Sequence, residues 1–283
     1  MSSKATPIDS ATTRPFATDA LGLGLRPSLV GPLCETWPDV GFLEVLVENF
    51  TGRAQLPRAQ LARLGARYPL VGHGVSLNLL GADPLDLEHL GRVRDLVREH
   101  RMPYFTDHLC WTASNGTHHH DLLPAPAHPD LVPYAAERAR AVQDFLGVPF
   151  GLENLSSYVT WGRDQMPEWD FLTEVVRRSG CWVMLDLNNI VVSAVNHGFD
   201  PEDYLRAIDW SRVLQVHVAG HATRPDGLRH DTHDREVSDP VWDLYRTAWR
   251  LGGPFPTLLE WDEHLPTLDE VLRVLRQALE VRA

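Results

Sequence analysis

The segment Val213–Arg235 has the sequence VLQVHVAGHATRPDGLRHDTHDR, in which an apolar run is followed by several histidines and aspartates. Its apolar beginning, Val213–Val216, predicts a buried strand that ends at His217. The loop that follows carries more imidazole and carboxylate side chains, namely His221, His230, Asp231, His233 and Asp234. Imidazole nitrogen and carboxylate oxygen are common ligands of zinc, iron and manganese. The segment alone predicts either a catalytic metal centre beyond a strand end or a polar, solvated loop.

Seven more apolar segments of strand length occur along the chain and alternate with helical patterns. The predicted strands are Leu21–Leu25, Phe42–Val47, Leu70–Val75, Met102–His108, Val148–Glu153, Trp182–Leu187, Val213–Val216 and Pro256–Trp261. The segment Leu109–Pro129 is expected to be a long loop. Eight strands alternating with helices are typical of the α/β class and of a (β/α)8 TIM barrel. An open, doubly wound sheet is the alternative, although no GxGxxG loop follows the first strand.

The length and composition set limits on the domain organisation. A chain of 283 residues, of which 43% are hydrophobic, can bury the core of one barrel or of two smaller domains. Residues 1–20 are rich in Ser, Thr, Ala and Pro and lack a continuous apolar segment, so we expect a disordered leader rather than a signal peptide. We expect residues 21–283 to form a single TIM-barrel domain.

The charge and the cysteines limit the partners and the compartment. With 26 basic and 38 acidic residues the net charge is −12, which disfavours nucleic acid as the main partner. No apolar run has the length needed to span a bilayer. The three cysteines, Cys34, Cys110 and Cys181, contain no CxxC pair and suit a reducing compartment. We therefore expect a cytoplasmic protein that binds neither nucleic acid nor a membrane.

Six consecutive predicted strands end in residue types that bind metals: His73, His108, Glu153, Asp186, His217 and Glu260. The carboxyl ends of the strands surround the active site of a TIM barrel, so these side chains are expected to meet. A single buried charge has a structural explanation, but six equivalent positions indicate a metal centre. With Asp231 and His233 added, the number of donor residues exceeds what one ion can bind. This number suggests two or three ions, with the carboxylate of Glu153 or Glu260 as the bridge between them.

Several short motifs resemble the domain-of-unknown-function family 692. They are HGVSLN (His73–Asn78), TDHLCW (Thr106–Trp111), HDLLP (His120–Pro124), GLEN (Gly151–Asn154), LDLNN (Leu185–Asn189), NHGFDP (Asn196–Pro201), QVHVAGH (Gln215–His221), DTHD (Asp231–Asp234) and LLEWD (Leu258–Asp262). Because they keep their order from about Leu21 to Leu279, the chain is identified as a member of this family. The resemblance implies a xylose-isomerase-like TIM barrel with multinuclear iron. The family includes the methanobactin-biosynthesis iron enzyme, which oxidises a precursor-peptide cysteine to an oxazolone and thioamide pair.

The resemblance also implies roles for individual residues. One iron would be held by His73, His108 and Glu153. A second would be surrounded by Glu153, Asp186, His217 and Glu260, with Asn189 nearby, and a third would be held by Asp231 and His233. Four further residues are expected to contact the substrate or to support the ligands: His120, Asn154, His197 and His221. The alternative for them is packing within loops.

The order of the ligands is also similar to that of endonuclease four, a relative with three zinc ions. That enzyme has Asp-x-x-His where this chain has Asp186-Leu-Asn-Asn189. An amide oxygen is a neutral, weaker ligand, so Asn189 would leave one metal more open to substrate or dioxygen. Together with the acidic charge, this difference argues against DNA repair.

The resemblance therefore implies a multinuclear non-haem iron oxidase that uses dioxygen to modify a residue, with cysteine favoured, of a ribosomally made precursor peptide. The expected cofactors are two or three iron ions in mixed ferrous and ferric states, and a small partner protein is expected to present the leader peptide. One alternative is a zinc or manganese hydrolase or isomerase that acts on sugars or abasic DNA. The other is a metal-binding accessory protein without catalysis.

Overall fold

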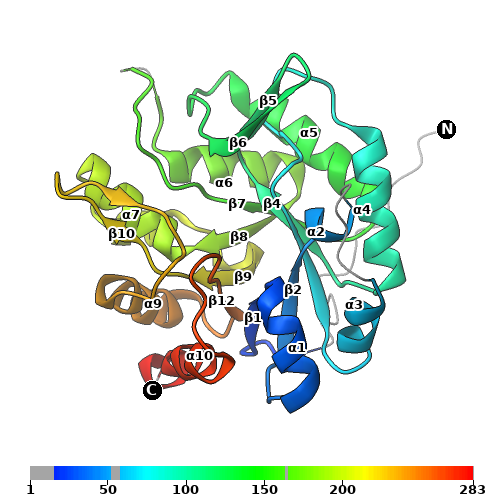
Figure 1. Cartoon of the computed structure of the whole chain (residues 1–283). Helices are drawn as coiled ribbons and strands as arrows, with labels where there is room; N and C mark the ends of the chain where they lie inside the picture. Colours follow the sequence, from blue (N-terminus) through cyan, green and yellow to red (C-terminus); the bar gives the residue numbers. More distant parts are fainter. Residues whose placement is uncertain (1–15, 52–57, 163–164, 283) are drawn as a thin grey trace.

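A computed structural model describes residues 16–51, 58–162 and 165–282 of the chain, and its centre is a closed barrel of eight parallel strands (Figure 1). Around the barrel the strands follow the order β1 (Leu21–Leu25), β12 (Thr257–Leu259), β9 (Val213–Val218), β8 (Trp182–Asp186), β7 (Phe150–Glu153), β4 (Phe105–His108), β3 (Leu70–Gly74) and β2 (Phe42–Leu46). The predicted (β/α)8 barrel is confirmed, and the doubly wound sheet is wrong.

Helices surround the barrel strands (Figure 1). They are α1 (Pro27–Thr36), α2 (Glu48–Thr51), α3 (Arg58–Gly65), α4 (Leu87–Glu99), α5 (Leu131–Leu146), α6 (Glu168–Ser179), α7 (Leu187–His197), α8 (Pro201–Ala207), the 3-10 turn η1 (Trp210–Arg212), α9 (Asp239–Gly252) and α10 (Leu268–Arg282). Local signals set their ends. The carboxylate of Asp86 accepts hydrogen bonds from the backbone N–H groups of Glu88 and His89 and caps α4, and Gly180 ends α6 with a φ of 76°. None of the helices in the described ranges could cross a lipid bilayer, given their length and polarity.

The segment Leu109–Pro129 differs from the prediction of a long loop. It contains an antiparallel hairpin of β5 (Trp111–Ser114) and β6 (Thr117–Leu123), which lies at the top of Figure 1. The turn residues Asn115 and Gly116 have positive φ angles of 50° and 72°, as a tight hairpin turn requires. The Asn-Gly pair is the sequence signal of such a turn, and the prediction overlooked it.

Helix α7 also lies where no helix was predicted, directly after β8. Asp186 is both the last residue of β8 and the N-cap of α7, and one of its carboxylate oxygens accepts a hydrogen bond of 2.6 Å from the backbone N–H of Asn189. One residue therefore ends the strand, starts the helix and holds a carboxylate at the mouth of the barrel. The loop after β9 carries the short strands β10 (Ala222–Thr223) and β11 (Arg229–His230).

An apolar layer, which we call the barrel floor, fills the barrel near the amino ends of its strands. Its members are Phe42, Val71, Tyr104, Leu214 and Leu258. Phe16 stacks on Phe42 with ring centroids 4.7 Å apart, so part of the expected leader packs against the barrel. Residues 1–15 of that leader lie outside the described residues. The floor confines the polar interior to the opposite end of the barrel.

We expect Leu258→Ala to lower the free energy of unfolding by about 2–5 kcal/mol, because it removes a large side chain from a close-packed layer and leaves a cavity. Leu258 is 0% exposed, whereas Leu279 on α10 is 51% exposed. The control Leu279→Ala should change stability by less than about 0.5 kcal/mol. Urea denaturation measures both values, and equal small losses would contradict the described packing of the floor.

Candidate metal centre

The barrel brings together the six side chains that the sequence placed at strand ends. His73, His108, Glu153, Asp186 and His217 lie in β3, β4, β7, β8 and β9, and Glu260 directly follows β12. All six are buried. Their ligand atoms form overlapping groups in which the atoms lie within 4.8 Å of one another. The expectation that these residues meet in one mouth agrees with the structure.

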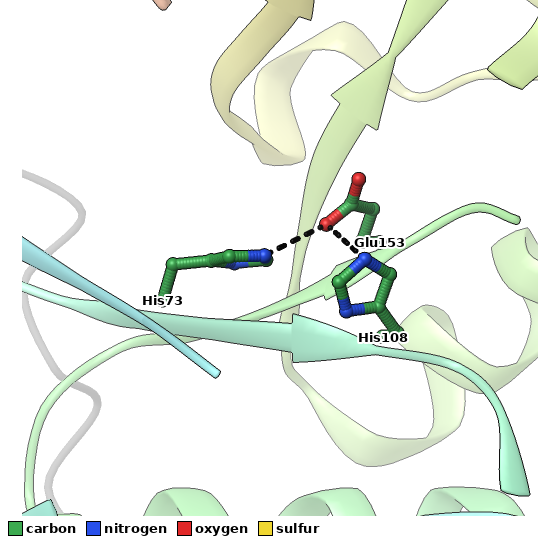
Figure 2. A group of neighbouring side chains, drawn as sticks. All are labelled: His73, His108 and Glu153. Atoms are coloured by element: carbon green, nitrogen blue, oxygen red, sulfur yellow. Dashed lines mark ion pairs between the residues drawn. The ribbon is translucent and has the colours of Figure 1, made fainter. Parts of the chain in front are cut away.

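The first group consists of two imidazoles and one carboxylate, and Figure 2 shows both rings directed at the same carboxylate. The Nε2 atoms of His73 and His108 lie 3.4 and 3.0 Å from Oε2 of Glu153. The Nδ1 atoms are hydrogen-bonded to Thr106 Oγ1 at 2.8 Å and to the Gly74 carbonyl at 3.2 Å. These contacts fix both rings, and burial lowers the pKa of both histidines, which favours the neutral, metal-binding form.

The second group contains Glu153, Asp186, His217 and Glu260. Nδ1 of His217 lies 3.2 Å from Oε2 of Glu260 and 3.9 Å from both Oε1 of Glu153 and Oδ2 of Asp186. Glu153 thus belongs to both groups, with one carboxylate oxygen toward each. Its carboxylate is placed as a bridge between two ions would require.

Glu44 of β2 is a buried member of the site that the sequence analysis missed. Its Oε2 lies 3.0 Å from Nε2 of His217 and also accepts a hydrogen bond from Gln215. Gln215 in turn accepts a 2.6 Å hydrogen bond from the hydroxyl of Tyr104 in the floor. Glu44 therefore holds the far side of the His217 ring and leaves Nδ1 facing the second group. The signal was a charged residue in the middle of the apolar strand FLEVL.

A third group surrounds His233, whose Nδ1 lies 3.3 Å from Oε2 of Glu260 and 3.2 Å from Oδ2 of Asp262. Its Nε2 lies 2.7 Å from Oδ1 of Asp231, so the predicted pair is together and adjoins the second group. Arg26 was not predicted and pairs with Glu260 at 2.9 Å and with Asp262. One positive charge of the protein is therefore already present at this edge of the site.

Asn154 and Asn189 support the end of β8. The side chain of Asn154 donates to the carbonyl of Asp186 at 2.9 Å and accepts from its N–H at 2.8 Å, which fixes the backbone of that residue. Asn189 donates to the carbonyl of Asn154 at 3.0 Å. Its Oδ1 is buried and has no hydrogen-bond donor within the part of the chain that the structure describes. That oxygen remains available to a ligand.

The other predicted residues lie farther out. His221 is hydrogen-bonded at 2.7 Å to Asn188, which donates to Asp231 at 2.7 Å, so one amide connects His221 to the predicted ligand Asp231. His197 is exposed at the end of α7 and belongs to none of the groups found among the described residues. His120 lies in β6, and its side chain is outside the described part.

The centre contains more buried carboxylates than buried positive charges. Burial raises the pKa of Glu153 well above its usual range and that of Asp186 to about 7. Burial favours the neutral ring of His217, but the carboxylates of Glu44 and Glu260 hold its pKa well above the ordinary value. Without metal, the centre therefore retains protons that a bound cation would displace.

Among the predicted site residues, three buried oxygens have no hydrogen-bond partner in the described ranges: Glu153 Oε2, Asp186 Oδ2 and Asn189 Oδ1. Buried polar atoms without partners are costly, and a cation would supply the missing contacts. Imidazole nitrogens with carboxylate oxygens and no thiolate suit iron, manganese or zinc. The residues present fit a metal centre of more than one ion.

Comparison with known sequences gives one family over nearly the whole chain. The family model described as RiPP precursor modification enzyme MbnB/TglH/ChrH matches residues 20–283. A UPF0276 protein of Anaeromyxobacter sp. (strain Fw109-5) is 41% identical over 262 residues, which cover 93% of this chain and 92% of the relative. A UPF0276 protein of Caulobacter vibrioides is 42% identical over 265 residues, which cover 93% and 94%.

Solved structures share the fold at low sequence identity. D-Psicose 3-epimerase from Clostridium cellulolyticum H10, solved with D-tagatose, has a TM-score of 0.60 at 14% identity and covers 92% of this chain and 97% of its own. A xylose isomerase domain protein from Alicyclobacillus acidocaldarius has a TM-score of 0.56 at 19% identity, with the same coverage of 92% and 97%. These similarities confirm a xylose-isomerase-like TIM barrel, and at this sequence identity they give information about the fold only.

We expect metal-free Asp186→Asn to become more stable relative to the wild-type protein as the pH rises from about 5 to 8. The pKa of Asp186 is raised to about 7 in the fold, so its contribution to stability is complete below the ordinary pKa and is lost as the pH rises through about 7. Asparagine can also cap the helix, and it does not ionise. The difference in unfolding free energy between Asp186→Asn and the wild type should therefore grow by an amount on the order of 3 kcal/mol between about pH 5 and pH 8.

Thermal denaturation at several pH values, in the presence of a chelator, measures this difference. Asp200→Asn is the matched control, because it replaces a carboxylate that caps α8 in solvent and accepts a hydrogen bond from the Glu202 N–H. A constant difference between Asp186→Asn and wild type across this pH range would contradict a carboxyl group whose charged form is destabilised by burial.

Proposed function

The chain belongs to the RiPP precursor modification enzyme MbnB/TglH/ChrH family, and on this premise we propose that it is a multinuclear non-haem iron oxidase of a precursor peptide. The observation that carries the proposal is the convergence of six buried imidazole and carboxylate side chains on one barrel mouth. The resemblance described above adds iron, dioxygen and a cysteine target. The acidic charge of −12 suits a basic leader peptide, or a small partner protein that presents it.

The overlapping groups suggest how the ions would be shared. His73, His108 and Glu153 would hold the first, and the other oxygen of Glu153 would extend to the second. That second ion would be completed by Asp186, His217 and Glu260. The resemblance adds Asn189, whose buried Oδ1 has no hydrogen-bond partner among the described residues.

A third ion would be held by Nδ1 of His233 with Glu260 and Asp262, whereas the predicted ligand Asp231 lies at the other ring nitrogen, Nε2. Arg26 already pairs with Glu260 there, and its positive charge opposes a cation. We therefore expect the third ion to bind more weakly than the first two.

Bound iron would supply the one-electron chemistry that uses dioxygen to oxidise the carbon beside a sulfur atom. The protein itself fixes the ligand geometry: Asn154 holds the backbone of Asp186, and Glu44 holds the ring of His217. The ligand groups among the described residues contain no cysteine. Cys110 is buried two residues after His108, and burial raises the pKa of its thiol well above the usual value, so its metal-binding thiolate form is disfavoured.

The first test is metal analysis of protein purified anaerobically from iron-supplemented cells, with Mössbauer spectra of the same sample. We expect about two to three irons per chain, with coupled ferric and ferrous signals, because the donors exceed what one ion uses. Stoichiometric zinc without iron would overturn the oxidase proposal and favour the zinc or manganese hydrolase or isomerase.

We expect Glu153→Gln to lose the bridging carboxylate and to retain less than about one tenth of the wild-type iron, with oxidation abolished accordingly. The substitution should leave the metal-free fold intact, because burial already disfavours the charge of Glu153. Glu137→Gln on the exposed side of α5 is the control and should load iron as the wild type does. Full iron content in Glu153→Gln would remove Glu153 from the ligand set.

A further inference from the structure

A cavity of about 320 Å³ is lined by residues that follow two of the ligand-bearing strands, β4 and β7. It opens between the segment after β6, the loop after β7 and helix α7. Its volume falls in the range of about 300–1,000 Å³ that is typical of ligand pockets. Its walls are mainly apolar and include Leu109, Leu155, Trp161, Met166, Trp169 and Phe199.

The cavity and the candidate metal centre share segments of chain. Leu109 directly follows His108, and Leu155 lies two residues after Glu153, so two wall residues continue from strands that end in predicted ligands. A group held in the cavity would therefore lie next to whatever is presented to the mouth of the barrel.

Hydrogen bonds hold the wall in place. The N–H of Ser157 donates to the hydroxyl of Ser193 at 2.9 Å, and that hydroxyl is 3.3 Å from the carbonyl of Leu155. The next residue, Tyr158, accepts a 3.0 Å hydrogen bond on its hydroxyl from the N–H of Asp231. Ser157 and Tyr158 are thus tied to α7 and to the segment that carries a predicted ligand, which holds this part of the wall in place.

The rim exposes apolar side chains to solvent. Val159 and Trp161 are 51% and 50% exposed, and both line the cavity. Clustered exposed apolar groups mark binding surfaces. The wall also contains Glu168, which is hydrogen-bonded to the hydroxyl of Tyr204, and burial raises its pKa to about 7. Burial thus disfavours the charge of Glu168 itself, and the mainly apolar lining favours an apolar occupant.

We infer that this cavity binds an apolar side chain, aromatic or long aliphatic, of the precursor peptide, beside the residue that enters the metal centre. The inference rests on the proposed function, since a peptide substrate supplies the occupant. The cavity would select peptides by a neighbouring side chain and would hold the modified residue in position. The ligand groups would then act on whichever residue the bound neighbour places at the mouth.

The probes for the test are N-acetyl-phenylalanine amide, N-acetyl-leucine amide and N-acetyl-asparagine amide, titrated against the full chain by ligand-observed NMR. We expect the two apolar probes to bind and the asparagine probe, which is uncharged and similar in shape to leucine, to bind on the order of tenfold more weakly. Trp161→Ala should weaken binding of the phenylalanine probe by about tenfold, as loss of an aromatic contact does. Trp161 is half exposed, so its removal spares the core.

Two matched controls separate the cavity from general surface effects. Leu279→Ala removes an apolar side chain of similar exposure, 51%, on α10. Val195→Ser on α7, where Val195 is 49% exposed, matches Val159→Ser at the rim. Only the cavity variants should weaken binding, and equal affinities in all variants would overturn the inference. Because the probes need neither metal nor dioxygen, a failed oxidase proposal would appear in the metal analysis and not in these titrations.

Discussion

The structure depends on the burial of several carboxylates and histidines in one small volume at the mouth of the barrel. Buried charges are tolerated only when opposite charges, protons or metal ions balance them. Glu153 and Asp186 have raised pKa values because burial outweighs the positive charge near them, whereas Glu260, beside His233 and His217, has a lowered one. The negative charge of the carboxylates is therefore balanced at Glu260 but not at Glu153 and Asp186. Bound cations would supply the missing positive charge.

The surrounding contacts keep this costly arrangement in one geometry. Glu44 and Gln215 hold the side of His217 that faces away from the second group. Asn154 clamps the backbone of Asp186, whose side chain also starts α7. His73, His108 and Asp186 are thus held by partners that add no negative charge, whereas carboxylates hold His217 and His233. Removing such a partner would loosen a ligand without removing it.

The sequence predicted the strands and the six ligand positions at strand ends, since period and length identify a strand and the barrel then fixes where its end points. Glu44 was missed because it lies inside the apolar strand FLEVL and not at its end, where ligands were sought, and its partner His217 is 173 residues away. Arg26 directly follows β1 but is not a metal-binding residue type, and its partner Glu260 is 234 residues away. The hairpin after β4 and helix α7 were local omissions, because Asn115-Gly116 and the cap at Asp186 are readable signals.

The barrel floor has a consequence for how this protein can change. Phe42, Val71 and Leu258 each lie two residues before a polar member of the site, Glu44, His73 and Glu260. Residues two apart on a strand share a face, so each strand passes from the floor to the site in one pleat. Substitutions can then affect the two layers separately. The floor residues maintain the barrel, while the ligand side chains one pleat above them can be replaced. Such a division makes one barrel a starting point for different chemistries.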